Sequence, residues 1–178
     1  GKDVEDIRNL STAQILEAQQ ELGDRLRNRE QRATPFQPVV DGEVLPEMPM
    51  VAIRKGSARN INIMSGSSRD ELKAMNAMNP ALRNLDEAGL ITMLRELLPA
   101  DLVPRLIAAY RDSLKKAGVT PTPAEILGSI NTDLMFRIPT IQLVEAQRDN
   151  GARAYNYLFT YRSPAMGGIL GAMHGLDN

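Results

Sequence analysis

The chain has 178 residues, of which 43% are hydrophobic and 24% charged, and its formal net charge is −1. This length and composition are those of a globular protein with its own core, and the near-neutral charge gives no reason to expect nucleic acid or an anionic membrane surface as a partner. The sequence has no cysteine, which excludes a disulfide scaffold and a zinc–thiolate site. No apolar run approaches the ~20 residues that span a bilayer.

The first 50 residues predict helical structure followed by an irregular connector. The opening stretch, GKDVEDIRNL, lacks the apolar region of a signal peptide, and its apolar residues recur at helical spacing. Ser11 and Gln14 fit a capping box, which predicts a helix from Ser11 to about Arg29. The stretch TPFQPVVDGEVLPEMPM then holds four prolines and an Asp-Gly pair, so we expect an extended connector with a turn rather than a regular element.

A short strand and a second helix cap follow this connector. The stretch NINIMSGSS predicts a strand at about 60–65, because isoleucine and methionine are followed by small residues that end it. Ser68 and Glu71 then form a second cap pattern, S-x-x-E, which predicts a helix that opens at Asp70.

Three longer helices are predicted in the middle of the chain. Residues 84–98 and 103–118 each place apolar residues on one helical stripe, and the second of these ends in two lysines and a glycine. Thr122 begins a third cap pattern, with a proline at the tolerated first helical position. The helix after it should run to about Arg148, and Pro139 should kink it.

The second predicted strand lies at about 154–161, within ARAYNYLFTY. It is aromatic and largely apolar, without alternation between polar and apolar residues. This pattern is typical of a strand in a parallel sheet that is buried on both faces. The sequence therefore predicts an α/β fold, mostly helical, with two strands in a parallel sheet.

Ionisable residues follow both predicted strands after short runs of small residues. Asp70 and Glu71 follow the first strand, and His174, the only histidine in the chain, follows the second within a glycine-rich stretch. Functional groups of open α/β sheets collect at the carboxyl ends of the strands. A carboxylate and then a histidine is also the chain order of the last two members of a Ser…Asp/Glu…His triad.

Five stretches of the sequence resemble the type B carboxylesterases, which include the para-nitrobenzyl esterases and the cholinesterases. They occur in the family's order and at about its spacing, and the similarity covers nearly the whole chain. The stretches are PVVDGEVLP (38–46), SSRDE (67–71), NTDLMFRIP (131–139), YNYLFTYRSP (155–164) and GAMHGLD (171–177).

The resemblance implies an α/β-hydrolase fold with a catalytic triad, in which Glu71 is the acid and His174 the base. A neutral imidazole can take the proton of a serine hydroxyl, and a carboxylate can stabilise the imidazolium that forms. Two alternatives concern the acid: Glu71 could only close a helix N-terminus together with Ser68, and Asp70 could be the acid instead. The resemblance implies no cofactor and no metal.

The sequence departs from the family pattern because it contains no G-x-S-x-G elbow and no match to the oxyanion-hole glycines. We therefore expect residues 1–178 to be a C-terminal segment of one catalytic domain, inactive without its N-terminal part. That part, the expected partner, would carry the nucleophilic serine and the oxyanion hole for a small-molecule ester substrate. The alternatives are a non-catalytic binding or adhesion relative of the same fold and an independent helical domain.

Overall fold

The computed structural model describes residues 4–27 and 36–177, and the chain divides into two compact units, residues 1–48 and 49–178. The first unit holds the 3-10 helix η1 (Val4–Asn9) and the helix α1 (Thr12–Arg27). The predicted capping box is present, since Ser11 N donates to Gln14 Oε1 at 2.9 Å and Gln14 N donates to Ser11 Oγ at 3.3 Å. The expected end of this helix near Arg29 lies outside the described residues.

The predicted Asp-Gly turn also lies in the first unit. The side chain of Asp41 accepts hydrogen bonds from the backbone N–H groups of Glu43 and Leu45, at 3.0 and 2.9 Å. Gly42 has a φ of +81°, which glycine adopts without strain. The backbone bonds from Leu45 and Glu43 lower the pKa of Asp41, because they stabilise its carboxylate form.

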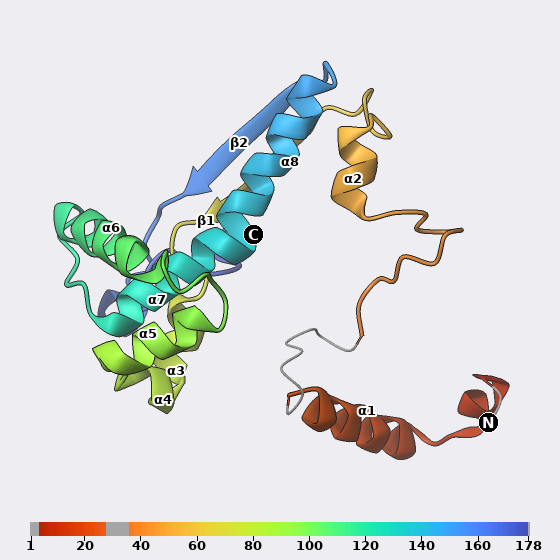
Figure 1. The fold of residues 1–178 in the computed structure, drawn as a ribbon, viewed down its shortest axis with the longest axis horizontal. Helices are drawn as coiled ribbons and strands as arrows, with labels where there is room; N and C mark the ends of the chain where they lie inside the picture. The colour runs from red at the N-terminus through yellow and green to blue at the C-terminus, as the bar shows by residue number, and fades with distance from the viewer. Residues whose placement is uncertain (1–3, 28–35, 178) are drawn as a thin grey trace. The chain divides into compact units, whose positions relative to one another are not determined.

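The second unit contains a pair of strands and most of the helices (Figure 1). Its elements in chain order are α2 (Pro49–Arg54), β1 (Ile63–Ser68), α3 (Lys73–Met78), α4 (Pro80–Arg83), α5 (Glu87–Arg95), α6 (Val103–Lys116), α7 (Pro123–Thr132), the π-helical turn η2 (Asp133–Arg137), α8 (Ile138–Asp149), β2 (Ala154–Phe159) and the 3-10 helix η3 (Ala165–Gly168). The helix α2 was not expected from the sequence, because the proline-rich stretch predicts irregular structure through Met50, whereas Pro49 is the first residue of that helix.

The two strands pair in parallel, as expected, with Ile63 opposite Ala154 and Ser68 opposite Phe159. The first strand was misplaced by three residues, since it begins at Ile63 and continues through the small residues that were expected to end it. The reason is visible at Gly66, where an added Cβ would lie 2.3 Å from the backbone oxygen of Tyr157. Small residues here allow the backbone of β1 to approach β2 closely.

The strand β2 is less covered than its composition predicts. The helix α8 packs against both strands, and Figure 1 shows it running alongside β2. However, Tyr155 keeps 60% and Tyr157 40% of its surface exposed, and Leu158 keeps 39%. Burial on both faces is therefore wrong for β2, because within the described residues α8 packs against the strand pair and these side chains stay open to solvent.

The apolar core of the second unit lies between α5, α6 and α7. The residue spacing predicted apolar stripes for α5 and α6, and both helices contribute buried side chains, although Leu90 of α5 was not part of the predicted stripe. For α7 no stripe was predicted, and it packs against both helices. The buried core side chains are Leu90, Leu94, Val103, Ile107, Ile126, Leu127 and Ile130.

The helical structure after Thr122 has the predicted length, but a π-helical turn stands where a simple kink at Pro139 was expected. Thr122 caps it by accepting a bond from Glu125 N at 3.3 Å, and helical structure continues to Asp149. The irregularity is the π-helical turn η2, which ends at Arg137, two residues before Pro139. Proline offers no N–H to the carbonyl four residues earlier, so the ladder has to adjust in this turn.

Candidate active site

The central contact of the candidate site joins Glu71 and His174. Oε2 of Glu71 lies 2.7 Å from Nδ1 of His174, although 103 positions separate the two residues in the chain. Glu71 follows the end of β1, and His174 lies in the loop after β2, so the parallel strand pair brings them to the same edge of the sheet. The contact that we expected from the sequence is therefore present.

The second carboxylate oxygen of Glu71 makes the bond that the helix-cap alternative predicted. Oε1 accepts from the backbone N–H of Ser68 at 2.7 Å. The rest of the cap is absent, because Ser68 Oγ has no hydrogen-bond partner among the described residues and the helix α3 begins at Lys73 rather than Asp70. One oxygen of Glu71 thus holds the turn after β1 (residues 69–72), and the other oxygen contacts the imidazole.

Glu71 and His174 differ sharply in exposure. Glu71 is only 5% exposed, whereas the side chain of His174 keeps 64% of its surface. With Nδ1 engaged by Glu71, the other ring nitrogen, Nε2, has no hydrogen-bond partner among the described residues. A buried carboxylate behind an accessible imidazole leaves Nε2 free to exchange a proton with a group brought in from solvent or from another part of a fold.

The ring of Phe136 packs against the imidazole. The two ring centroids are 5.3 Å apart, and the planes are tilted by 51°. Phe136 belongs to the π-helical turn η2, so the irregular turn before Pro139 brings this ring to the candidate site. The sequence analysis did not single out Phe136, although it lies in the stretch NTDLMFRIP that resembled the family.

Asp70, the alternative acid, faces other partners. Its Oδ2 accepts from the backbone N–H of Ala172 at 2.8 Å and from the guanidinium of Arg69 at 3.1 and 3.3 Å. Its own backbone N–H donates to the carbonyl of Ala172 at 3.0 Å. No hydrogen bond or ion pair joins Asp70 to His174 within the described part of the chain, so the structure favours Glu71 as the imidazole's partner.

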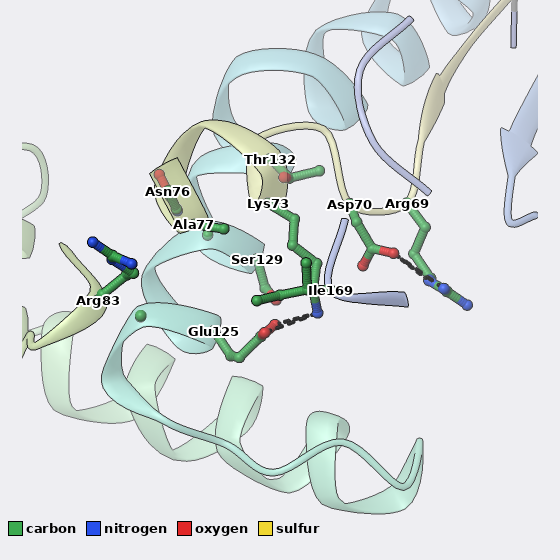
Figure 2. Close-up of a pocket in the computed structure, with 12 residues that line it drawn as sticks. Arg69, Asp70, Lys73, Asn76, Ala77, Arg83, Glu125, Ser129, Thr132 and Ile169 are labelled. Atoms are coloured by element: carbon green, nitrogen blue, oxygen red, sulfur yellow. Dashed lines mark hydrogen bonds and ion pairs between the residues drawn. The ribbon is translucent and has the colours of Figure 1, made fainter. Parts of the chain in front are cut away.

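A cavity beside the turn after β1 (residues 69–72) is lined by two ion pairs. Figure 2 shows the amino group of Lys73 meeting Glu125, at 2.8 Å, and the guanidinium of Arg69 meeting Asp70. The cavity lies between α3, α4 and α7, and Arg83 and Ser129 also line it. Each of the two acidic groups has a cation, and Arg83 adds one further positive charge to the lining.

Two tyrosines, Tyr110 on α6 and Tyr157 on β2, have a raised pKa and donate a hydrogen bond to an aspartate. Burial, followed by the 2.6 Å bond to Asp133, raises the pKa of Tyr110 well above its ordinary value. The bond to Asp177 raises the pKa of Tyr157, which is on the open strand β2. This second bond ties β2 to the chain just beyond His174.

Within residues 4–27 and 36–177, no three histidine, cysteine or acidic side chains gather in a way that could hold a metal ion. In the same part of the chain, no helix combines the length and the apolar character needed to cross a membrane.

The fold and the site fit one class of protein, the α/β hydrolases. Two parallel strands, helices packed around them, and a carboxylate–histidine pair at the strand ends together form part of an α/β-hydrolase fold. The sequence pattern of the carboxylesterase family matches residues 2–178, and the chain belongs to that family.

Several curated relatives are similar over about three quarters of the chain. Carboxylesterase 1E of Rattus norvegicus is 26% identical over 77% of this chain and 26% of its own length. Liver carboxylesterase 1F of Rattus norvegicus is 31% identical over 69% of this chain and 23% of its own length. Liver carboxylesterase of Sus scrofa is 26% identical over 72% and 24%. The chain spans about a quarter of the length of these relatives.

Proposed function

We propose that this chain supplies the acid and the base of a serine carboxylic-ester hydrolase, with Glu71 as the acid and His174 as the base. The observation that carries the proposal is the 2.7 Å contact between Glu71 Oε2 and His174 Nδ1. Membership of the carboxylesterase family and the position of both groups at the strand ends support it. A lone histidine in a glycine-rich loop would not by itself justify this assignment.

Each of the two residues has one role in this proposal. Glu71 fixes the ring so that Nδ1 carries the proton and Nε2 is the basic nitrogen, and it stabilises the imidazolium. Nε2 of His174 takes the proton of the serine hydroxyl as the hydroxyl oxygen bonds to the ester carbonyl carbon. The same nitrogen then gives that proton to the leaving alcohol, and an acyl-enzyme remains, which water hydrolyses with the same base.

The nucleophile and the oxyanion hole would come from a part of the fold that this sequence does not contain. The 178 residues include no G-x-S-x-G elbow, and the relatives are about four times as long as the matched region. The exposed aromatic residues of β2 favour the same view, since strands of a parallel sheet normally have both faces covered. We use the term assembled enzyme for this chain joined to, or associated with, that nucleophile-bearing part.

Hydrolysis of p-nitrophenyl acetate tests this proposal. The assembled enzyme should hydrolyse the ester and lose activity to a serine-directed phosphonate, whereas the 178-residue chain alone should show no turnover above background. Replacing His174 with Asn should lower kcat by orders of magnitude without preventing assembly. An assembled enzyme that binds the phosphonate nowhere and hydrolyses no ester would instead indicate the non-catalytic binding relative.

A further inference from the structure

Several hydrogen bonds attach the loop that carries His174 to the turn after β1 (residues 69–72). Besides the bond between the two side chains, His174 N donates to the backbone oxygen of Glu71 at 3.3 Å. Asp70 adds two bonds to Ala172, one through its backbone N–H at 3.0 Å and one through its carboxylate at 2.8 Å. Neighbouring residues of the turn therefore hold residues 172 and 174 of the loop.

The side-chain bond from Asp70 satisfies a buried group. Ala172 is 0% exposed, so its N–H has no access to water, and a buried N–H without an acceptor is costly. Oδ2 of Asp70 is that acceptor, and the guanidinium of Arg69 balances its charge. Other bonds also hold this loop, since Ser163 N donates to the backbone oxygen of Gly171 at 2.9 Å and the Tyr157 hydroxyl donates to Asp177 at 3.0 Å, but neither involves the N–H of Ala172. Gly171 and Gly175, on either side of residues 172–174, adopt positive φ values of +63° and +76°, so the backbone here adds little stiffness of its own.

We propose that Asp70 is a positioning residue, which fixes the His174 loop through Ala172 so that the imidazole meets Glu71. The expected effect of Asp70 on catalysis rests on the proposed function, but its effect on the position of the His174 loop does not. Asp70 touches neither the imidazole nor any reacting atom, and it acts two residues away from the base. A small displacement of a catalytic group can cost on the order of a hundredfold in rate.

The test compares three variants in the assembled enzyme. Asp70→Ala removes the acceptor for Ala172 N–H, whereas Asp70→Asn keeps an acceptor oxygen at the same place. Asp86→Ala is the matched control, since the Asp86 carboxylate likewise accepts a backbone N–H, that of Gly89 at 2.7 Å, but at the start of α5. We expect Asp70→Ala to lower kcat by ten- to a hundredfold with KM within about twofold, Asp70→Asn to recover most of kcat, and Asp86→Ala to leave it unchanged.

A second readout follows the imidazole itself. His174 is the only histidine of the chain, so this chain can be produced separately with 15N-histidine and then associated with the unlabelled nucleophile-bearing part, which gives one unambiguous ring spectrum. The Nδ1–H proton bonded to Glu71 should be protected from solvent exchange in the unmodified protein, in Asp70→Asn and in Asp86→Ala, and should be lost or broadened in Asp70→Ala. Amide exchange at Ala172 should accelerate in the same variant only.

The outcomes separate this inference from the proposed function. If Asp70→Ala keeps a protected Nδ1–H and an unchanged kcat, or if it merely lowers the melting temperature as Asp86→Ala does, the positioning role is overturned. If the assembled enzyme hydrolyses no ester but Asp70→Ala still releases Nδ1–H, the proposed function fails while the positioning role stands.

Discussion

An alanine at Gly171 should be far more damaging than an alanine at Gly167, although both glycines have similar backbone conformations. Gly171 has a φ of +63° and Gly167 a φ of +70°, so either substitution forces an L-residue into the left-handed region. That strain costs about 1–2 kcal/mol at either position. The surroundings differ, because nothing lies within 4 Å of a Cβ built at Gly167.

At Gly171 the new Cβ would lie 2.5 Å from Oδ2 of Asp70 and 2.9 Å from Cδ of Lys73. The lysine methylene can move, but the carboxylate oxygen is the acceptor for Ala172 N–H, and its displacement leaves that buried N–H unpaired. Loss of this bond adds about 1–3 kcal/mol. We therefore expect Gly171→Ala to lower the free energy of unfolding by about 2–5 kcal/mol in total, against about 1–2 kcal/mol for Gly167→Ala.

Urea denaturation of the two variants in the assembled enzyme measures this difference, and turnover measured in parallel tests its consequence for His174. Gly171→Ala should also lower kcat, because it displaces the same carboxylate that Asp70→Ala removes. Equal losses of stability and unchanged turnover in both variants would refute the reasoning that the turn after β1 holds the His174 loop.

Three other predictions concern the strand pair, the core and the state of association. Gly66→Ala should lower the free energy of unfolding by about 3 kcal/mol or more in a urea titration, because the Cβ meets the backbone of Tyr157; a loss below about 0.5 kcal/mol would contradict the register. Tyr110→Phe should cost about 1.5–3 kcal/mol through its lost bond to Asp133. The folded state raises the pKa of Tyr110, so this tyrosine contributes its full stabilisation below its ordinary pKa near 10, and the stabilisation declines as pH rises above that value. Thermal melts measured at increasing pH above 10 should therefore show a smaller loss of stability in Tyr110→Phe than in the unmodified protein. In analytical ultracentrifugation the chain alone should self-associate through its exposed β2 face, and a cooperatively melting monomer would contradict this expectation.

Short sequence patterns, such as helix caps, predicted where several helices of the fold begin. Ser11 with Gln14 and Thr122 with Glu125 bond as helix caps, because these bonds join residues three positions apart and need no tertiary context. The placement of β1 failed for the opposite reason. Its small residues read as the end of a strand, and only the close approach of Tyr157, 91 positions away from Gly66, explains why they belong to it.

Part of the candidate site was predicted from the sequence, and part depends on tertiary contacts that the sequence does not reveal. Chain order and the resemblance predicted Glu71 and His174, and the structure brings them into contact. The role of Asp70 was not predictable, since its partner Ala172 has no distinctive side chain and offers only its backbone. Phe136 was equally hidden, because a π-helical turn decides where its ring points.

The central claim is that Glu71 and His174 act together as the acid and base of an ester hydrolase. The most direct measurement compares kcat of the assembled enzyme for p-nitrophenyl acetate in Glu71→Gln and in Glu87→Gln. Glu87 also loses a close charged contact, its pair with Arg111 at 2.6 Å, but on the exposed side of α5. We expect Glu71→Gln to lower kcat on the order of 10⁴-fold, because the imidazole loses its orienting carboxylate, and Glu87→Gln to leave kcat within about twofold. A Glu71→Gln enzyme as active as the Glu87→Gln enzyme would contradict the account.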